Sequence, residues 1–284
     1  MAQHKVGLVL EGGGMKGLFT AGVLDFFLEK NLEFGEIIGV SAGAIHAVGF
    51  LSKQKRRSLD ITLRFVNDKR YCSLSSLRKT GDLFNAKFAY YEIPEKYFPF
   101  DHDTFMKSKT KVFAVATNTD TAEAEYLQIK DLRTDDIEAL RASASIPMLS
   151  NDVEYRGEKY LDGGVSDSIP LKQLEADGYP KNIVVMTKSA NYRKKPSKTH
   201  LAMKKRYRNC PELIERVKNR HTEYNACLDY LNKQEESGKI FVIRPSNDDT
   251  KRIEKDTAKL QKLYDEGYNT AKKLYPQLKQ FLEQ

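Results

Sequence analysis

The sequence has few cysteines and no long apolar run. Its 284 residues include three cysteines, no two of them spaced as Cys-x-x-Cys: Cys72, Cys210 and Cys227. An odd number without that spacing indicates neither a disulfide framework nor a zinc site, and is typical of a reducing compartment. No window approaches the roughly 18 apolar residues of a transmembrane helix. The run Val6–Leu10 is too short for the core of a signal peptide. We therefore expect a cytoplasmic protein.

Acidic residues are scarce in one segment, and positive charge is concentrated there. The whole chain has a formal net charge of +8, yet residues 191–220 alone hold eleven lysines and arginines against two glutamates. Such a local excess calls for a local explanation. One is peripheral contact with an anionic membrane, with Tyr192 and Tyr207 interleaved among the cations. The other is a solvated basic helix or loop. Because the segment carries no nucleic-acid-binding motif, we expect no nucleic-acid partner.

Short apolar strands alternate with helical patterns along the chain. Buried strands are predicted at 5–11, 37–40, 111–118, 181–187 and 239–244, with an edge strand at 126–129 and a hairpin at 152–161. Helical spacing follows from residue 18 and at 135–145, 169–177 and 249–284. This alternation indicates an α/β fold with a largely parallel sheet. We expect a core over 1–190, with 191–284 adding the basic segment, one strand and C-terminal helices to the same domain.

A serine lies at a predicted corner between a strand and a helix. Ile37, Ile38 and Val40 are apolar, as a buried strand requires, and Gly39-Val40-Ser41-Ala42-Gly43 follows the G-x-S-x-G pattern of a nucleophile elbow. The neighbours of a nucleophile in such a corner must lack bulk, and Gly39 and Gly43 meet that need. The same pattern also fits a glycine-flanked serine that caps a helix.

A glycine-rich turn follows the first predicted strand. Gly12-Gly13-Gly14-Met15-Lys16-Gly17 matches the dinucleotide-binding fingerprint and stands between a strand and a helix. A dinucleotide fold places an acidic residue at the end of the next strand, where this chain has Ser41. The alternative is an oxyanion hole, whose backbone amides face a nucleophile on the neighbouring strand end.

A serine nucleophile needs a base, and no histidine has the setting of one. His4 precedes the first strand, and we expect His46, on the elbow helix, to point away from the tip of Ser41. His102, His200 and His221 are also interpreted as ordinary surface or packing histidines. Asp162 follows a strand and precedes Gly163 and Gly164, which would let the backbone approach the elbow. A free aspartate is a weak base for a serine hydroxyl, so we expect burial or the helix dipole to assist.

Aromatic residues are concentrated between residues 85 and 105, where Pro94 and Pro99 are expected to break any helix. One interpretation is a satellite core beneath a long loop. The other is the wall or lid of an apolar acyl pocket.

Three motifs stand in order: the glycine turn 12–17, the elbow 39–43 and Asp162-Gly163-Gly164. Together they resemble the patatin-like phospholipase family of bacterial type, over at least residues 5–190. The resemblance implies a three-layer α/β/α sandwich and a Ser-Asp dyad, with Ser41 as nucleophile and Asp162 as base. Gly13 and Gly14 would bind the oxyanion within the turn Gly12–Gly17, and Lys16 stands where the family usually has arginine. Residues 142–147 look like the family's Ser/Pro block.

The activity that the resemblance implies is hydrolysis of lipid carboxylic esters, of phospholipase A type, through an acyl-enzyme intermediate and without a metal or cofactor. A catalytically weak membrane-binding or regulatory protein is one alternative. Acyl transfer to an alcohol is a second outcome of the same chemistry, and a dinucleotide-binding oxidoreductase is the remote third.

Overall fold

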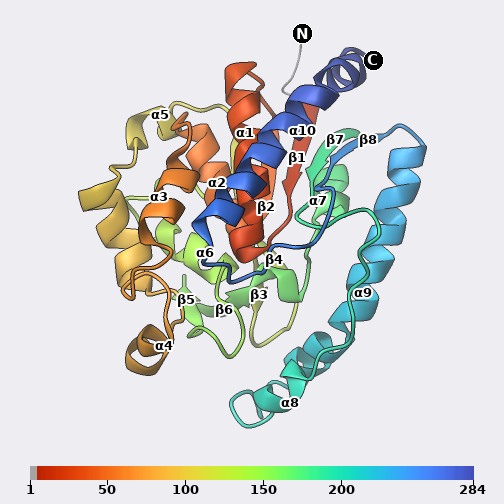
Figure 1. Ribbon diagram of the computed structural model, residues 1–284. Coiled ribbons are helices and arrows are strands. Elements are labelled where there is room, and N and C mark those ends of the chain that lie inside the picture. Colours follow the sequence, from red (N-terminus) through yellow and green to blue (C-terminus); the bar gives the residue numbers. More distant parts are fainter. Residues whose placement is uncertain (1–4) are drawn as a thin grey trace.

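The computed structural model describes residues 5–284, so His4 lies outside the described residues. These residues form one central sheet with the strand order β5-β6-β3-β2-β1-β7-β8, and β4 pairs with β3 (Figure 1). The strands are β1 (Val6–Leu10), β2 (Glu36–Val40), β3 (Lys111–Asn118), β4 (Ala124–Gln128), β5 (Val153–Tyr155), β6 (Glu158–Asp162), β7 (Lys181–Val185) and β8 (Ile240–Ile243).

The sheet is largely parallel, as predicted. β1 pairs in parallel with β2 and β7, β2 with β3, and β7 with β8. Only β4, β5 and β6 join by antiparallel pairing. Arg156 and Gly157 connect β5 to β6 with φ angles of 52° and 87°, the left-handed pair that a tight hairpin turn requires.

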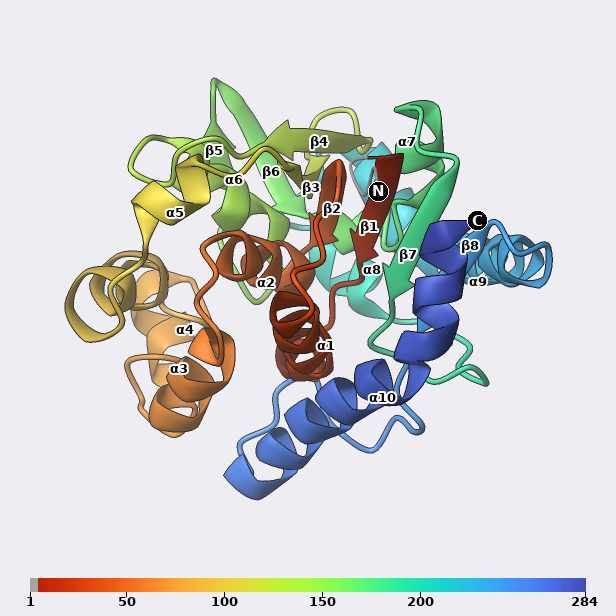
Figure 2. The same cartoon turned by 90° about the horizontal axis from the view of Figure 1, so that it is seen from above.

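Helices cover both faces of the sheet because successive strand residues point to opposite sides. Leu8 and Leu10 belong to the apolar core shared with α1 (Leu18–Glu29), α2 (Ala42–Leu51), α6 (Asp136–Ser143) and α10 (Thr257–Glu283). Val9 belongs to the core shared with α7 (Leu171–Ala176) and α9 (Pro211–Glu236). The view in Figure 2 shows α1 and α10 on one side of the strands. The predicted α/β/α sandwich is therefore confirmed.

Residues 191–284 contribute to every layer of this sandwich. β8 extends the sheet beside β7, α9 packs on one face, and α10 crosses α1 on the other (Figures 1 and 2). The short α8 (Thr199–Met203) and the first turns of α9 carry much of the basic segment. The 26-residue α9 was not predicted from the sequence.

The expectation that Pro94 breaks a helix is wrong. The chain from Lys87 to Tyr97 forms the continuous π-helix η3, with Pro94 inside it. A π turn is wider than an α turn, and it accommodates a ring that would clash with a carbonyl in a regular α-helix. η3 lies near α3 (Arg57–Phe65), α4 (Leu74–Thr80) and α5 (His102–Met106), outside the sheet. None of the helices described for residues 5–284 combines the length and apolar composition that crossing a bilayer requires.

Candidate active site at the carboxyl ends of the strands

Ser41 lies at the corner between β2 and α2 in a strained conformation. Its φ of 54° and ψ of −120° place a non-glycine residue where side chains are rare. A Cβ at Gly39 would lie 2.5 Å from the backbone of Ala44, and one at Gly43 would lie 2.3 Å from the carbonyl oxygen of Leu10. The corner therefore depends on two residues without side chains, which hold α2 tightly against β1 and β2.

The glycine turn packs directly against this corner. A Cβ at Gly12 would lie 2.9 Å from the carbonyl oxygen of Val40 and 3.1 Å from the Cβ of Ser41. Within residues 5–284, no protein acceptor takes a hydrogen bond from the amides of Gly12, Gly13 or Gly14. These amides lie beside Ser41, where donors could stabilise a developing negative charge on a substrate oxygen.

Sheet register places Asp162 and Ser41 at the same edge of the sheet, on strands that are separated by β3. Val40, the last residue of β2, pairs with Val115 of β3, and the next β3 residue, Ala116, pairs with Asp162. Asp162 is 8% exposed, and its Oδ1 accepts a hydrogen bond of 2.8 Å from the amide of Gly164. One carboxylate oxygen is thus held by the backbone, which fixes the orientation of the other.

The segment 142–147 ties both residues to one scaffold. Ser143, at the end of α6, accepts a buried hydrogen bond of 2.8 Å from the amide of Ser41 through its Oγ. The carbonyl of Ser145 accepts one of 2.8 Å from the amide of Asp162. Because both bonds originate within three residues, a small change in this segment would move Ser41 and Asp162 together.

Ser41 and Asp162 line a small polar pocket of about 30 Å³. Gly12, Gly13, Gly14 and Gly164 also line this polar pocket, so these predicted site residues come together. Lys16 does not line it, because its Nζ donates to the carbonyl of Asp248 at 3.2 Å and lies 3.6 Å from that carboxylate. Gly17 packs instead against His46 and Ala42 of α2.

No histidine of the described chain lines the polar pocket. The Nδ1 of His46 lies 2.9 Å from Ser58 Oγ, and burial lowers the pKa of His46 to about 4. The ring is therefore neutral at physiological pH. It lines a different cavity, which Ser41 also lines.

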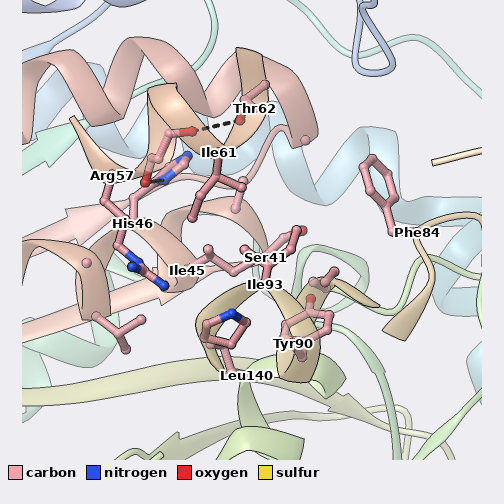
Figure 3. A pocket seen from close by; sticks show the side chains of 18 of the residues that line it. Ser41, Ile45, His46, Arg57, Ile61, Thr62, Phe84, Tyr90, Ile93 and Leu140 are labelled. Carbon is pink, nitrogen blue, oxygen red and sulfur yellow. Dashed lines mark hydrogen bonds between the residues drawn. The ribbon is translucent and has the colours of Figure 1, made fainter. Parts of the chain in front are cut away.

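This apolar cavity of about 200 Å³ is lined by residues of α2, α3 and η3 and by Ser41 (Figure 3). Figure 3 shows Ile45, Ile61, Ile93, Tyr90 and Leu140 gathered around Ser41, with Phe84 further away. The aromatic segment divides between the two predicted roles. Tyr90 and Phe100 line the apolar cavity, whereas Phe88, Tyr97 and Phe98 pack on Phe65 in a satellite core.

Several residues of the site were missed in the sequence. Glu11 directly follows β1 and is 2% exposed. Its carboxylate accepts hydrogen bonds from Thr187, at 2.6 and 3.0 Å, and from the hydroxyl of Tyr224 at 2.5 Å. Lys188 and Arg252 line the polar pocket as well. The position of Glu11 and Lys188 just past the carboxyl ends of parallel strands was the available signal. Arg252 and Tyr224 come from distant segments, and the sequence carried no signal that they belong to the site.

The chain matches two protein-family models. The family model described as patatin-like phospholipase matches residues 8–175, more than half of the chain, and a model described as a domain of unknown function (DUF6363) matches residues 210–283. The chain is 27% identical over 252 residues to the uncharacterized protein YjjU of Escherichia coli, covering 85% of this chain and 68% of YjjU.

Two further relatives match shorter stretches. The mouse 1-acylglycerol-3-phosphate O-acyltransferase Pnpla3 is 28% identical over 138 residues, which is 47% of this chain and 32% of that protein. The probable lipid hydrolase 463L of Invertebrate iridescent virus 6 is 26% identical over 181 residues, which is 58% of this chain and 61% of the viral protein. Among solved structures, VipD from Legionella pneumophila superposes with a TM-score of 0.45 at 15% identity, covering 98% of this chain and 66% of that one.

Proposed function

Because this chain belongs to the patatin-like phospholipase family, we propose that it is a serine acyl hydrolase that cleaves carboxylic esters of lipids. The substrates are phospholipids or lysophospholipids, and the reaction proceeds through Ser41 and Asp162 with an acyl-enzyme intermediate.

The observation that carries the proposal is the position of Ser41 between two different environments. It lines both the apolar cavity, which suits an acyl chain, and the polar pocket that holds Asp162 and the glycine amides. An ester with its chain in the apolar cavity would present its carbonyl carbon to Ser41 Oγ and its carbonyl oxygen to Gly12, Gly13 and Gly14.

The first half of the reaction forms the acyl-enzyme. Ser41 Oγ attacks the carbonyl carbon while its proton passes to the carboxylate of Asp162. The amides of Gly12, Gly13 and Gly14 donate to the oxyanion, and the N-terminal end of α2 adds its dipole. The tetrahedral intermediate then collapses, the C–O bond to the alcohol breaks, and Asp162 returns the proton to the departing alkoxide.

The second half releases the acid. Asp162 takes a proton from a water molecule, which attacks the acyl carbonyl, and the resulting tetrahedral intermediate expels Ser41 Oγ. The proton held by Asp162 returns to that oxygen, so the enzyme is regenerated. Every step uses groups of this chain, the ester and water.

The test is a pair of substitutions with a labelling readout. Ser41→Ala should abolish ester hydrolysis and fluorophosphonate labelling, because it removes the nucleophile. Asp162→Asn keeps nearly the same shape but cannot accept the proton, so we expect a loss approaching that of Ser41→Ala. His46→Ala should lose far less. Wild-type turnover in Ser41→Ala would refute the nucleophile, and a mild Asp162→Asn beside a severe histidine variant would replace the dyad with a triad.

Acyl transfer is the second candidate, and it uses the same intermediate. The mouse relative is named for transfer to 1-acylglycerol-3-phosphate. Incubation with a labelled acyl donor and an unlabelled lysolipid acceptor separates the two outcomes: labelled free acid supports hydrolysis, and labelled diacyl product supports transfer. A catalytically weak regulatory protein would yield neither product. The dinucleotide-binding alternative gains no support from the family to which the chain belongs.

We also propose that the basic segment 191–220 contacts anionic membranes peripherally, from a cytoplasmic location. Five of its cations are exposed and have no carboxylate partner within residues 5–284: Lys195, Lys198, Lys204, Lys205 and Arg208. Each of these side chains could add up to about 1 kcal/mol to the free energy of binding to an anionic leaflet, and salt screens this attraction. Replacing these five by glutamine should abolish the excess pelleting with anionic over neutral vesicles at low salt. Equal pelleting before and after the change would end this proposal.

The division of the chain into a core at 1–190 and an added region at 191–284 remains a proposal too. We expect both regions to form one domain, so limited proteolysis should not leave a stable fragment that ends near residue 190, and a folded fragment of that kind would show that 191–284 is a separate unit.

A further inference from the structure

Four cations from distant parts of the chain meet beside Ser41. Lys188 follows β7, Lys194 lies in the basic segment, Arg220 is on α9, and Arg252 lies in the loop before α10. All four line the polar pocket, where the carboxylates are those of Glu11 and Asp162. We call Lys188, Lys194, Arg220 and Arg252 the cation cluster. Its charge exceeds that of the two carboxylates by two.

The cation cluster forms the boundary between the catalytic residues and a larger space. Lys194, Arg220 and Arg252 also line an outer cavity of about 940 Å³, which lies beneath the basic segment. The apolar cavity adjoins the polar pocket, since Gly14, Ser41 and Ile146 line both. An ester whose acyl chain occupies the apolar cavity therefore directs the remainder of the molecule toward the cation cluster.

Aromatic rings and backbone hold these cations in place. Lys188 Nζ lies 5.1 Å from the ring centre of Tyr192, and Lys194 Nζ lies 4.4 Å from that of Tyr224. The two rings pack edge to face, with their centres 5.9 Å apart and an interplanar angle of 89°. The carbonyl of Arg252 accepts a hydrogen bond of 3.0 Å from the amide of Met15, next to the glycine turn. The cluster is thus preorganised by the same elements that form the site.

The charges of the cluster are only partly compensated within the protein, by the two carboxylates of Glu11 and Asp162 that share the polar pocket. Within residues 5–284, no carboxylate lies within 4.0 Å of any of the four cations, since the ion pairs found there engage other residues. The Nε of Arg220 is buried and has no hydrogen-bond partner among the described residues. Both oxygens of Glu11 are occupied by Thr187 and Tyr224.

Holding such cations together out of water costs free energy, and this cost lowers the pKa of both lysines. Burial lowers the pKa of Lys188 to about 8 and that of Lys194 to about 7, with neighbouring cations adding to the effect. A buried donor without a partner is rare and usually has a reason. An anion bound among these side chains would supply both the missing acceptor and the missing charge.

We propose that the cation cluster binds the phosphate of the substrate's head group, and that the enzyme prefers acylglycerol phosphates with a phosphate monoester to zwitterionic or uncharged lipids. This rests on the acyl hydrolase function proposed above. Lysine and arginine are donors without acceptors, and the arginine fork matches phosphate oxygens. A phosphate monoester carries a charge of about −1.5 to −2 at pH 7. A choline head group would instead add a positive charge close to the cation cluster.

The experiment compares three lipids with the same single acyl chain: monooleoylglycerol, oleoyl lysophosphatidate and oleoyl lysophosphatidylcholine. Each is presented in the same neutral detergent micelle at physiological salt, so that surface charge contributes little. We expect the wild-type kcat/KM to favour lysophosphatidate over each of the others by about 10-fold or more. Arg220→Gln should reduce that preference by about 10-fold, the lower end of the usual effect of losing a hydrogen bond to a charged group.

Lys218→Gln is the matched control, because it removes one charge two residues earlier on α9. Lys218 is exposed and pairs with Glu215, so the preference should stay at its wild-type value. Equal kcat/KM for the three lipids in the wild type would overturn the proposal. So would the same preference in Arg220→Gln and in the wild type.

Two further arms separate this proposal from others. Titration of the Ser41→Ala protein with glycerol 3-phosphate and inorganic phosphate measures anion binding without turnover, and binding should weaken in a Ser41→Ala/Arg220→Gln protein. If inorganic phosphate binds but the wild type does not distinguish the lipids, the cluster holds a free anion and the head-group proposal is overturned. If no lipid and no fluorophosphonate probe reacts with the wild type, the hydrolase function itself fails.

Discussion

Gly43→Ala should lower the activity because it disturbs a close contact between α2 and β1 that lies outside the polar pocket. A Cβ at residue 43 would lie 2.3 Å from the carbonyl oxygen of Leu10 and 2.8 Å from its carbonyl carbon. Both atoms are backbone, so neither can turn aside. To reach even 3.0 Å, the closest approach that real Cβ atoms show, α2 and β1 must separate by about 0.7 Å at this point. Leu10 stands two residues before Gly12, so the shift separates Ser41 from the amides of the glycine turn.

The magnitude follows from two general effects. Forcing one extra carbon into a closely packed contact lowers the free energy of unfolding by about 1–3 kcal/mol. A misplacement approaching 1 Å between a nucleophile and its partner groups costs up to about 100-fold in rate. We therefore expect the kcat/KM of Gly43→Ala to fall by about 10- to 100-fold, mainly in kcat, in a protein that is still folded.

The assay pairs ester turnover with urea unfolding of the same preparations. Gly49→Ala, on the same helix, is the control for stability, since the atom nearest its added Cβ would be Ser58 Oγ at 3.9 Å. Alanine at this helical position should raise the free energy of unfolding by about 0.5–1 kcal/mol. If Gly43→Ala kept the wild-type kcat/KM within about threefold, the tight contact with β1 would not control the position of Ser41.

Three other outcomes can be measured. Gly267→Ala should lower the free energy of unfolding in urea by about 1–3 kcal/mol, because its Cβ would lie 2.0 Å from the carbonyl oxygen of Phe19 where α10 crosses α1; an unchanged midpoint would mean that the helices separate freely. Between the pKa of about 4 that His46 has in the folded protein and the usual 6.5, the folded protein binds fewer protons at this residue than the unfolded chain does. His46 therefore contributes up to about 3 kcal/mol to the free energy of unfolding above pH 6.5, and this contribution is lost as the pH falls toward 4. His46→Gln should flatten the loss of stability over that range, and equal slopes would exclude the assignment. Gly49→Leu should place a side chain in the apolar cavity and lower turnover of long-chain esters about 10-fold relative to acetyl esters, and an unchanged ratio would place the acyl chain elsewhere.

Elements with a strong local signal were predictable from the sequence. The strand at 111–118 was predicted with the bounds of β3, because its apolar and β-branched residues have no other stable arrangement. Arg156 and Gly157 form the predicted hairpin turn, where the φ angles are positive. The corner at Ser41 follows from small residues on both sides of it. Each of these features depends on residues within about one turn of chain.

Tertiary structure alone determined which side chains share the polar pocket. Asp162 comes to line the same pocket as Ser41 through the pairing of β6 with the last residues of β3. Lys16, in the predicted oxyanion turn, is drawn away by Asp248, more than two hundred residues later. Arg220 points to the polar pocket although it belongs to a segment whose charge suggested a surface role. The physical reason is that backbone preferences are local, whereas the environment of a charge is set by whichever distant elements pack around it.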